Sequence, residues 1–151
     1  MAQLTLLTPL GDITVSEDDG AIVSLDWGRV EDQTPTPLLL RAHDQLNDYF
    51  DGGSQDFDLP LNPYGTAFQR RVWAALSSIP YGARRSYADI ARQVGSGPRA
   101  VGGANGRNPI PIIIPCHRCV AADGSLGGYS GLDGPSTKQF LLDLESRDLL
   151  T

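Results

Sequence analysis

The charged residues of this chain are divided sharply along its 151 positions. Residues 1–64 hold two arginines against twelve acidic residues, residues 65–122 hold eight arginines against one acidic residue, and residues 123–151 hold two basic residues against five acidic ones. The overall charge of −6 therefore conceals a basic module inside an acidic protein. Arginine pairs with phosphate through a two-pronged contact and stacks on bases, and the module contains no lysine. This pattern favours a nucleic-acid partner over a surface that is merely solvated.

The change of sign coincides with a predicted linker. Residues 54–64 contain Pro60 and Pro63, and prolines are typical of connecting segments. A chain of this length suits one domain, or two small ones that share an interface. We therefore expect an acidic unit over residues 1–64 and a basic unit over residues 65–151.

The composition narrows the class of protein. Apolar residues make up 40% of the chain, which is enough for a packed core, and no apolar run approaches the roughly 20 residues of a membrane helix. The first residues, Met1 to Thr5, lack the basic start and the apolar stretch of a secretory signal. We expect a cytoplasmic protein with no membrane partner.

The two cysteines are too few for a disulfide framework. A structural zinc site would need Cys116, Cys119, His117 and His43 together. The first three lie within one short stretch and His43 lies far upstream in a predicted helix, so we expect no metal site. A role as reactive thiols is therefore favoured over a structural role for these cysteines.

The acidic unit has the pattern of a small antiparallel β-meander followed by one helix. Apolar or alternating runs over Leu4–Leu7, Ile13–Ser16 and Ala21–Trp27 are separated by turn-forming residues. Apolar residues then recur at helical spacing over 35–50, until the glycine-containing turn at 51–53 ends the helix.

The basic unit is expected to begin and end with a helix. Thr66 and Gln69 form a capping-box pattern ahead of apolar residues at helical spacing, which predicts a helix over 66–78. A similar pattern that begins at Ser136 predicts a last helix over 136–147.

Two short helices around a glycine are predicted at about 86–104. Ser86 with Asp89 gives a start signal, Gly95 breaks the chain, and a second short helix follows. Such a pair is a helix-turn-helix candidate, although glycine turns between helices also occur in proteins that never meet DNA. Arg99 falls in the first turn of the second helix, where a recognition helix presents side chains to a duplex. A surface salt bridge is the alternative for Arg99, but acidic residues are nearly absent nearby.

Cys116 is the candidate nucleophile. The β-branched run Ile110–Ile114 is too apolar to be exposed and predicts a buried strand that leads to it. A thiolate attacks electrophiles, and His117 can assist if the chain leaves the strand at Pro115. Two alternatives stay open: Cys116 is a small buried apolar residue, or it forms a redox pair with Cys119. A thioredoxin-like pair would open a helix, whereas the residues that follow have the composition of a loop.

Glu145 is a candidate partner for His117. It lies three and four residues after Leu142 and Leu141, so it shares a helical face with leucines of the predicted core. Cys116, His117 and Glu145 would then form a relay that favours the thiolate, by the logic of a nucleophile–histidine–acid triad. The alternative is a carboxylate at the helix end that escapes to solvent.

A series of motifs runs nearly without interruption from residue 65 to residue 145. They are Gly65–Gln69, Val72-Trp73, Ile79–Gly82, Ser86-Tyr87, Arg99–Ala104, Asn108-Pro109, Ile114–Arg118, Gly128–Gly131 and Leu141–Glu145. The series resembles the O6-alkylguanine-DNA alkyltransferases, also called methylated-DNA–protein-cysteine methyltransferases. The Pro-Cys-His-Arg core, with the upstream arginine and asparagine at matching spacing, is its most specific part. Residues 1–64 resemble the family's ribonuclease-H-like amino-terminal domain only in pattern.

The resemblance implies an α/β fold of the α+β kind, in which a small ribonuclease-H-like antiparallel β domain precedes a mostly helical domain with the helix-turn-helix. It implies DNA repair by direct, irreversible and stoichiometric transfer of the alkyl group of O6-alkylguanine, with O4-alkylthymine as a further candidate substrate and with no cofactor. Cys116 would accept the alkyl group and His117 would act as base through a bridging water. Glu145 would orient His117, Asn108 would tie the active-site turn to the helix pair, and Tyr87 would stabilise or protonate the leaving guanine.

The resemblance further implies a monomer that binds double-stranded DNA through its minor groove. The damaged nucleotide would be flipped out, because a buried cysteine cannot reach an alkyl group inside a duplex. The resemblance implies that the flipped base is contacted by Tyr129, Ser130 and Cys119. It implies that the duplex is contacted by Arg99, Ala100, Gly102, Arg107 and Arg118. Arg99 would take the place of the flipped nucleotide in the stack.

Three features depart from the family pattern. Cys119 stands where a β-branched residue is usual, the second helix is slightly short between Gly95 and Arg99, and Leu132 stands where a second glycine is common. Cys119 bears on oxidation of the Cys116 thiol, and the short helix bears on contacts with the DNA groove. Leu132 bears on the width of the pocket.

Three other function classes remain open. A thiol-disulfide protein would show a reversible disulfide between Cys116 and Cys119. A helix-turn-helix regulator would bind one DNA sequence without covalent change. A non-catalytic lesion sensor normally lacks the cysteine, so Cys116 argues against it.

Overall fold

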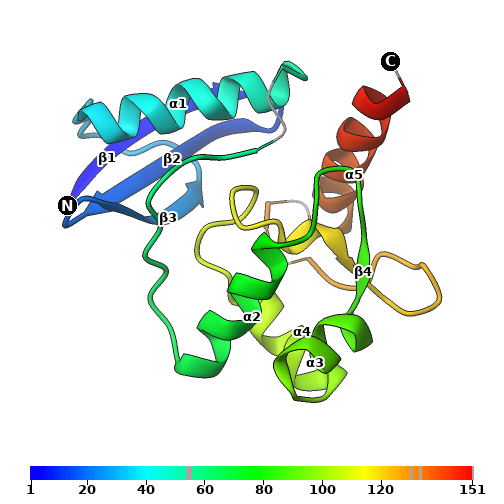
Figure 1. Cartoon of the computed structure of the whole chain (residues 1–151). Coiled ribbons are helices and arrows are strands. Elements are labelled where there is room, and N and C mark those ends of the chain that lie inside the picture. The colour runs from blue at the N-terminus through cyan, green and yellow to red at the C-terminus, as the bar shows by residue number, and fades with distance from the viewer. Residues whose placement is uncertain (54–55, 130, 133, 151) are drawn as a thin grey trace. The chain divides into compact units, whose positions relative to one another are not determined.

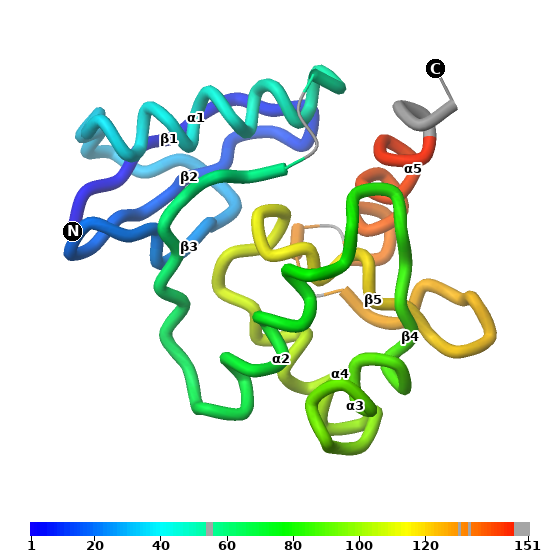
Figure 2. The backbone as a smooth tube through the Cα atoms, viewed as in Figure 1, coloured from blue at the N-terminus to red at the C-terminus, as the bar shows by residue number. Residues whose placement is uncertain are grey.

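The computed structural model describes residues 1–53, 56–129, 131–132 and 134–150, with side chains as far as residue 146. The chain forms two compact units, Met1–Tyr64 and Gly65–Thr151. Figure 1 shows the elements of each unit, and Figure 2 traces the backbone through them. Within these ranges no helix has the length and apolar character needed to cross a membrane.

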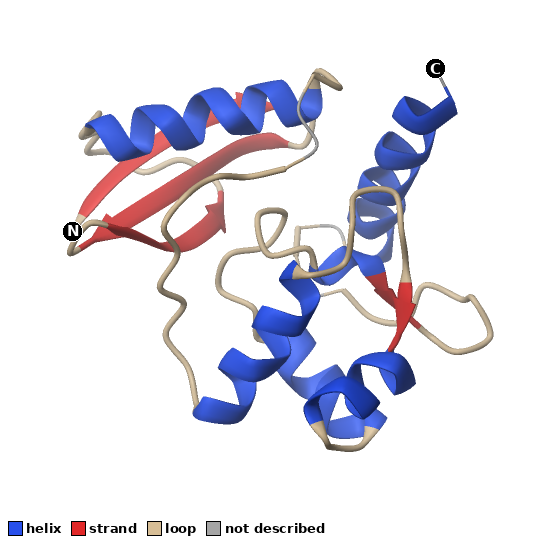
Figure 3. Cartoon of the chain, viewed as in Figure 1, coloured by secondary structure: helices blue, strands red, loops and turns tan. Residues whose placement is uncertain are grey.

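The first unit is a three-stranded antiparallel sheet with one helix packed on it (Figure 3). Strands β1 (Ala2–Thr8), β2 (Gly11–Asp18) and β3 (Ala21–Trp27) follow one another in sheet order, and α1 (Pro37–Phe50) contacts all three. The predicted meander and helix are confirmed.

Buried apolar side chains of the strands and of α1 form the core of this unit. The side chains of Ile13, Val15 and Leu25 in the sheet, and of Leu39 and Leu46 in α1, are each at most 2% exposed. Val15 lies opposite Leu25 in the antiparallel register of β2 and β3, so the buried face continues across the strands. The sheet and the helix therefore bury their apolar faces against each other.

The segment predicted as a linker is partly built into the sheet. The backbone N–H of Ile22 donates to the carbonyl of Pro60 at 2.8 Å, and the N–H of Asn62 donates to the carbonyl of Ile22 at 2.8 Å. These bonds place Leu61 beside β3 in a parallel bridge. Residues 60–62 thus cover the edge of β3, which would otherwise expose unpaired backbone groups.

Three helices form the basic part of the second unit. Helix α2 (Ala67–Ser77) begins with the predicted capping box, in which Thr66 and Gln69 satisfy each other's backbone N–H groups. Helix α3 (Tyr87–Val94) and helix α4 (Pro98–Gly106) form the helix-turn-helix, and α2 packs on both.

The turn between α3 and α4 follows from its sequence. Gly95 has a φ of 72°, in the left-handed region that glycine adopts without a steric penalty. The indole N–H of Trp73 donates to the carbonyl of Ala104 at 2.9 Å, so α2 also holds the end of α4.

The predicted strand over Ile110–Ile114 is wrong. The run is buried as expected, but it folds into a tight turn in which the N–H of Ile114 donates to the carbonyl of Ile110 at 2.9 Å. Pro111 has no N–H for a strand ladder, and Ile112 adopts a φ of 73°. The apolar character of this segment reports its burial and not its backbone shape.

The turn leads into the short elements around the cysteines. A 3₁₀ turn, η1 (Cys116–Arg118), is followed by β5 (Cys119–Val120), which pairs in parallel with β4 (Arg85–Ser86). Helix α5 (Pro135–Leu150) closes the unit and packs against η1. It begins one residue before Ser136, which therefore lies inside the first turn and does not cap the helix as predicted.

We expect Gly65→Ala to destabilise the protein. An added Cβ would lie 2.4 Å from a ring carbon of Trp73 and 2.7 Å from the Gln69 side-chain oxygen that closes the capping box. Trp73 is 2% exposed and has no room to withdraw. Overpacking of this kind lowers the free energy of unfolding by about 1–3 kcal/mol, measurable by urea denaturation.

Gly103→Ala is the matched control for this substitution, because an added Cβ at Gly103 meets nothing within 4 Å. In the middle of a helix this change should be neutral or stabilising by about 0.5–1 kcal/mol. Equal stabilities of the two variants would contradict the steric account.

Candidate active site

Cys116 lies two residues after the turn at Ile110–Ile114, which Asn108 holds in place. Asn108 donates from Nδ2 to the carbonyl of Ile114 at 2.8 Å and accepts the N–H of Ile110 at 3.0 Å. Its side chain also lies close enough to the Cys116 thiol to lower the pKa of that thiol. These side-chain bonds lie within the turn, so the expected tie from Asn108 to the helix pair stays a prediction.

The Cys116 thiol is neutral in the resting protein. The side chain is 5% exposed, and burial raises its pKa, although the Asn108 side chain and the charge of Lys138 oppose the shift. Burial likewise raises the pKa of Cys119 to about 12. A redox pair needs a lowered pKa at the attacking thiol, so these surroundings speak against a thioredoxin-like role. A base must remove the proton before Cys116 can attack.

Directly after the cysteine lies a fully buried ionic cluster. Nε2 of His117 is 2.6 Å from Oε2 of Glu145, and Arg118 donates from Nε and Nη2 to the two oxygens of Glu145 at 2.9 and 3.1 Å. Arg118 also donates from Nη1 to the carbonyl of Ile79 at 2.7 Å. The predicted contact between His117 and Glu145 is present, and Glu145 does not escape to solvent, being 1% exposed.

The expected contact of Arg118 with DNA does not fit this structure. Its side chain is only 7% exposed, and its three donor nitrogens are bonded inside the protein. A buried carboxylate needs a counter-ion, and a guanidinium meets both of its oxygens at once. The family resemblance placed Arg118 at the duplex, whereas its packing makes it part of the protein core.

The cluster determines the protonation states of Glu145 and His117. Burial alone would raise the pKa of Glu145, but the hydrogen bond from His117 and the charge of Arg118 outweigh it and lower the pKa to about 2. Burial lowers the pKa of His117. Glu145 is therefore an anion whose charge Arg118 balances, and His117 is neutral with its proton on Nε2. Its other nitrogen, Nδ1, is buried and has no hydrogen-bond partner among the described residues.

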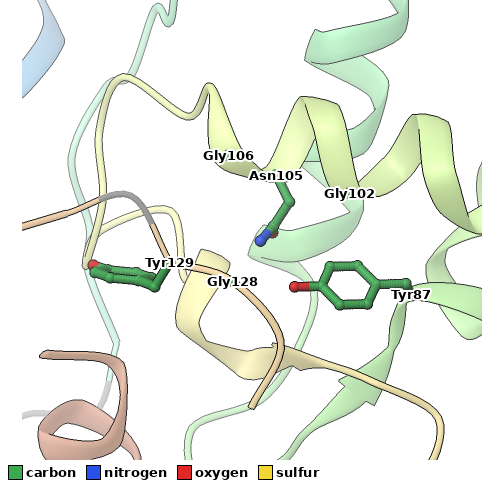
Figure 4. Close-up of a pocket in the computed structure, with 6 residues that line it drawn as sticks. All are labelled: Tyr87, Gly102, Asn105, Gly106, Gly128 and Tyr129. Atoms are coloured by element: carbon green, nitrogen blue, oxygen red, sulfur yellow. The ribbon is translucent and has the colours of Figure 1, made fainter. Parts of the chain in front are cut away.

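Beside this cluster the helix-turn-helix and the loop before α5 enclose a pocket of about 480 Å³ (Figure 4). Tyr87 lines it from the first residue of α3, and Gly128 and Tyr129 line it from the loop. The remaining lining residues come from α4: Gly102, Asn105 and Gly106. The helices expected to meet DNA thus also form the pocket wall.

The loop before α5 depends on glycine where it passes Tyr87. Gly127 has a φ of 70°, and a Cβ there would lie 2.8 Å from the hydroxyl of Tyr87. Leu132, the departure from the family pattern, has a φ of 38° and is exposed, so a branched side chain occupies a conformation that glycine prefers. Ser130 lies outside the described residues.

Two predicted base contacts have different outcomes. Tyr129 lines the pocket, and its buried hydroxyl has no hydrogen-bond partner in the described part of the chain. Cys119 is fully buried in β5 and is not among the residues that line this pocket, so its expected contact with the base stays a prediction.

The residues expected at the duplex lie on or near α4. Arg99 and Ala100 are exposed in its first turn, and Arg107 is exposed at its end. Gly102 is half-buried at the pocket. Arg92, one of the arginines near the helix pair, forms an ion pair with Asp89.

Sequence reasoning missed Lys138. This side chain is fully buried, donates from Nζ to the carbonyl of Cys119 at 2.6 Å and to that of Gly128 at 3.3 Å, and lies 5.8 Å from the centre of the Tyr87 ring. It ties the pocket loop to β5. It is the single lysine of the chain and lies two helical turns before Glu145, and that combination could have drawn attention to it.

Asn105 was missed as well. It is 4% exposed, lines the pocket, and donates from Nδ2 to the carbonyl of Cys116 at 3.4 Å. Its place on the face of α4 that buries Val101 and Ala104 was visible in the helical spacing.

The matches to known protein families fall on the same two units of the chain. Family models of 6-O-methylguanine DNA methyltransferase match twice: the ribonuclease-like domain over residues 3–63 and the DNA binding domain over residues 67–147. The constitutive methylated-DNA–protein-cysteine methyltransferase of Bacillus subtilis is 45% identical, with 93% of each chain covered. That of Methanosarcina barkeri is 44% identical, covering 94% of this chain and 95% of its own.

A solved structure agrees with these matches. The crystal structure of Mycobacterium tuberculosis OGT in complex with DNA superposes with a TM-score of 0.88 at 43% identity, covering 98% of this chain and 94% of that one. The resemblance inferred from the motifs and the predicted fold class are both confirmed.

We expect Arg118→Met to destabilise the protein strongly. The Glu145 carboxylate would stay buried without its permanent counter-ion, and removing one partner of a buried ion pair costs about 3–5 kcal/mol. Urea denaturation at neutral pH measures the change. The double variant Arg118→Met/Glu145→Gln should regain part of the loss, because a neutral amide needs no cation. A double variant no more stable than the single one would contradict the assignment of charges.

Proposed function

The chain belongs to the 6-O-methylguanine DNA methyltransferase family, and from this we propose that it repairs DNA by moving the alkyl group of O6-alkylguanine onto its own Cys116. One observation carries the assignment of the nucleophile. Cys116 is a buried thiol that follows a turn held by Asn108, and the next residue is a neutral histidine that an ionised Glu145 orients. His117 can serve as the base in this arrangement, because a neutral imidazole has a free nitrogen that accepts the thiol proton.

The transfer step uses these groups in order. Nδ1 of His117 takes the thiol proton through a bridging water, and the sulfur attacks the alkyl carbon bound to O6. The new S–C bond forms as the C–O bond breaks, and the electron pair of that bond leaves with guanine. Tyr87 stabilises or protonates the leaving base; burial, and then the nearby thiols, raise its pKa, so its hydroxyl keeps the proton it would donate. The product is a thioether that thiol exchange does not reverse, so each molecule acts once.

Binding to DNA precedes the chemistry. The M. tuberculosis relative was solved in complex with DNA, which supports DNA as the partner of this chain. We assign the contact to the minor groove and to α4, whose first turn exposes Arg99 and Ala100. Cys116 is 5% exposed, so the damaged nucleotide must leave the stack, and Arg99 would fill the space it vacates.

The first experiment measures the intact mass of the protein after incubation with duplex DNA that bears one O6-methylguanine. We expect a gain of one methylene unit, saturating at one per protein molecule, and peptide mapping should locate it on Cys116. Cys116→Ala should bind the duplex and gain nothing, while Cys119→Ser should still gain it. Methylation of Cys116→Ala would refute the assigned nucleophile, and no gain by the reduced wild type would refute transfer itself.

Arg99→Ala should slow transfer from duplex DNA by about tenfold to a hundredfold, because base flipping loses the group that fills the gap. Transfer from the free base O6-benzylguanine should stay within about twofold of the wild type, since no flipping is needed there. Arg41→Ala removes the same charge from the first unit and serves as control. Equal slowing of both substrates by Arg99→Ala would show that the variant disturbs the thiol and not the flipping step.

A further inference from the structure

The amide of Asn105 has a hydrogen-bond partner at one of its two polar atoms. Nδ2 donates to the carbonyl of Cys116, whereas Oδ1 is buried and has no hydrogen-bond partner in the part of the chain that the structure describes. A flipped amide would set two acceptors against each other, so the bond to Cys116 fixes the orientation. Buried acceptors are rarely left unpaired, and an exception calls for an explanation.

The unpaired oxygen belongs to a pocket-lining side chain. Figure 4 shows Asn105 reaching from α4 into the space between the rings of Tyr87 and Tyr129, with the Tyr87 hydroxyl directed to the same space. The wall of the pocket thus presents an acceptor from α4 and a donor from α3. Apolar surroundings strengthen the preference of each for a complementary partner.

The chemistry of the damaged base limits what can pair with that acceptor. Alkylation at O6 removes the hydrogen from N1, so the ring nitrogens of O6-alkylguanine that remain free are all acceptors. The exocyclic 2-amino group is then the single donor on the base edges. O4-alkylthymine has no donor there at all, because its alkylated ring has lost the hydrogen of N3.

We propose that Oδ1 of Asn105 accepts a hydrogen bond from the 2-amino group of the flipped O6-alkylguanine, which makes Asn105 a specificity-determining residue. The inference rests on the proposed function. Because Nδ2 holds the carbonyl of Cys116, one amide links the amino edge of the base to the backbone of the nucleophile. Guanine is thereby favoured over alkylated bases without the amino group.

The test compares single-turnover transfer from two duplexes that differ in one group. One bears O6-methylguanine and the other O6-methylhypoxanthine, which is the same base without the 2-amino group. A neutral hydrogen bond corresponds to a preference of about fivefold to tenfold, which we expect of the wild type. In Asn105→Leu the two rate constants should agree within about twofold. Asn105→Met carries the same expectation if the leucine variant does not fold.

Two further variants separate the acceptor from the shape of the pocket. Asn105→Asp keeps an acceptor at this position, so it should keep the preference even though a carboxylate near the thiol slows both reactions. Gly102→Ala narrows the same wall without removing an acceptor and should also keep the ratio.

The outcomes separate the role of Asn105 from the proposed repair reaction. A wild type without preference, or an Asn105→Leu variant with the wild-type ratio, would overturn the role of Asn105 while leaving the repair reaction intact. Failure of the wild type to accept methyl from O6-methylguanine would overturn the proposed function, and this inference with it.

Discussion

The carboxylate of Glu145, buried and ionised, is the constraint on which the rest of the second unit depends. It receives donors from three residues in two parts of the chain: His117 and Arg118 in η1, and the backbone N–H of Gly82 in the connection after α2, at 3.2 Å. Arg118 extends the same network to the carbonyl of Ile79. A charge without water must be paired at every lone pair, so α5, η1 and this connection can pack only in a narrow set of arrangements.

The same ionic pairing determines the chemistry available to Cys116. Arg118 supplies the positive charge that Glu145 requires, so His117 can remain neutral while it donates from Nε2. Without Arg118, the carboxylate would draw a second proton onto the imidazole, and a protonated histidine cannot act as base. In the proposed reaction, a buried arginine thereby keeps His117 in the neutral form that a base requires. Burial raises the pKa of the Cys116 thiol, so in the proposed reaction His117 must remove its proton.

Local signals in the sequence predicted the parts of the fold that are decided locally. The capping boxes at Thr66 and Ser86 and the glycine at position 95 specify where helices begin and end, and the structure follows them. The turn at Ile110–Ile114 could not be predicted in this way, because an apolar run shows that a segment is buried and leaves its shape to the surroundings. Long-range pairing was equally hidden: the partners of Arg118 lie far away along the chain, and nothing local distinguishes a core arginine from one that meets DNA. The contact between His117 and Glu145 could be predicted, because a carboxylate on the buried face of a helix needs a polar partner. Lys138 and Asn105 bond backbone carbonyls, and no side-chain pattern reveals such partners.

Helix α4 shows how a weak element can serve at the centre of a site. Its sequence contains three glycines within nine residues, and each glycine costs about 0.8–1 kcal/mol of helix stability relative to alanine. The helix is nonetheless held, because Val101 and Ala104 are buried and the Trp73 indole bonds the Ala104 carbonyl. Two of the three glycines, Gly102 and Gly106, lie at the pocket wall, where a larger side chain would occupy space that a base needs. The low propensity of α4 is therefore explained by what must approach it, and α2 supplies the stability that α4 lacks.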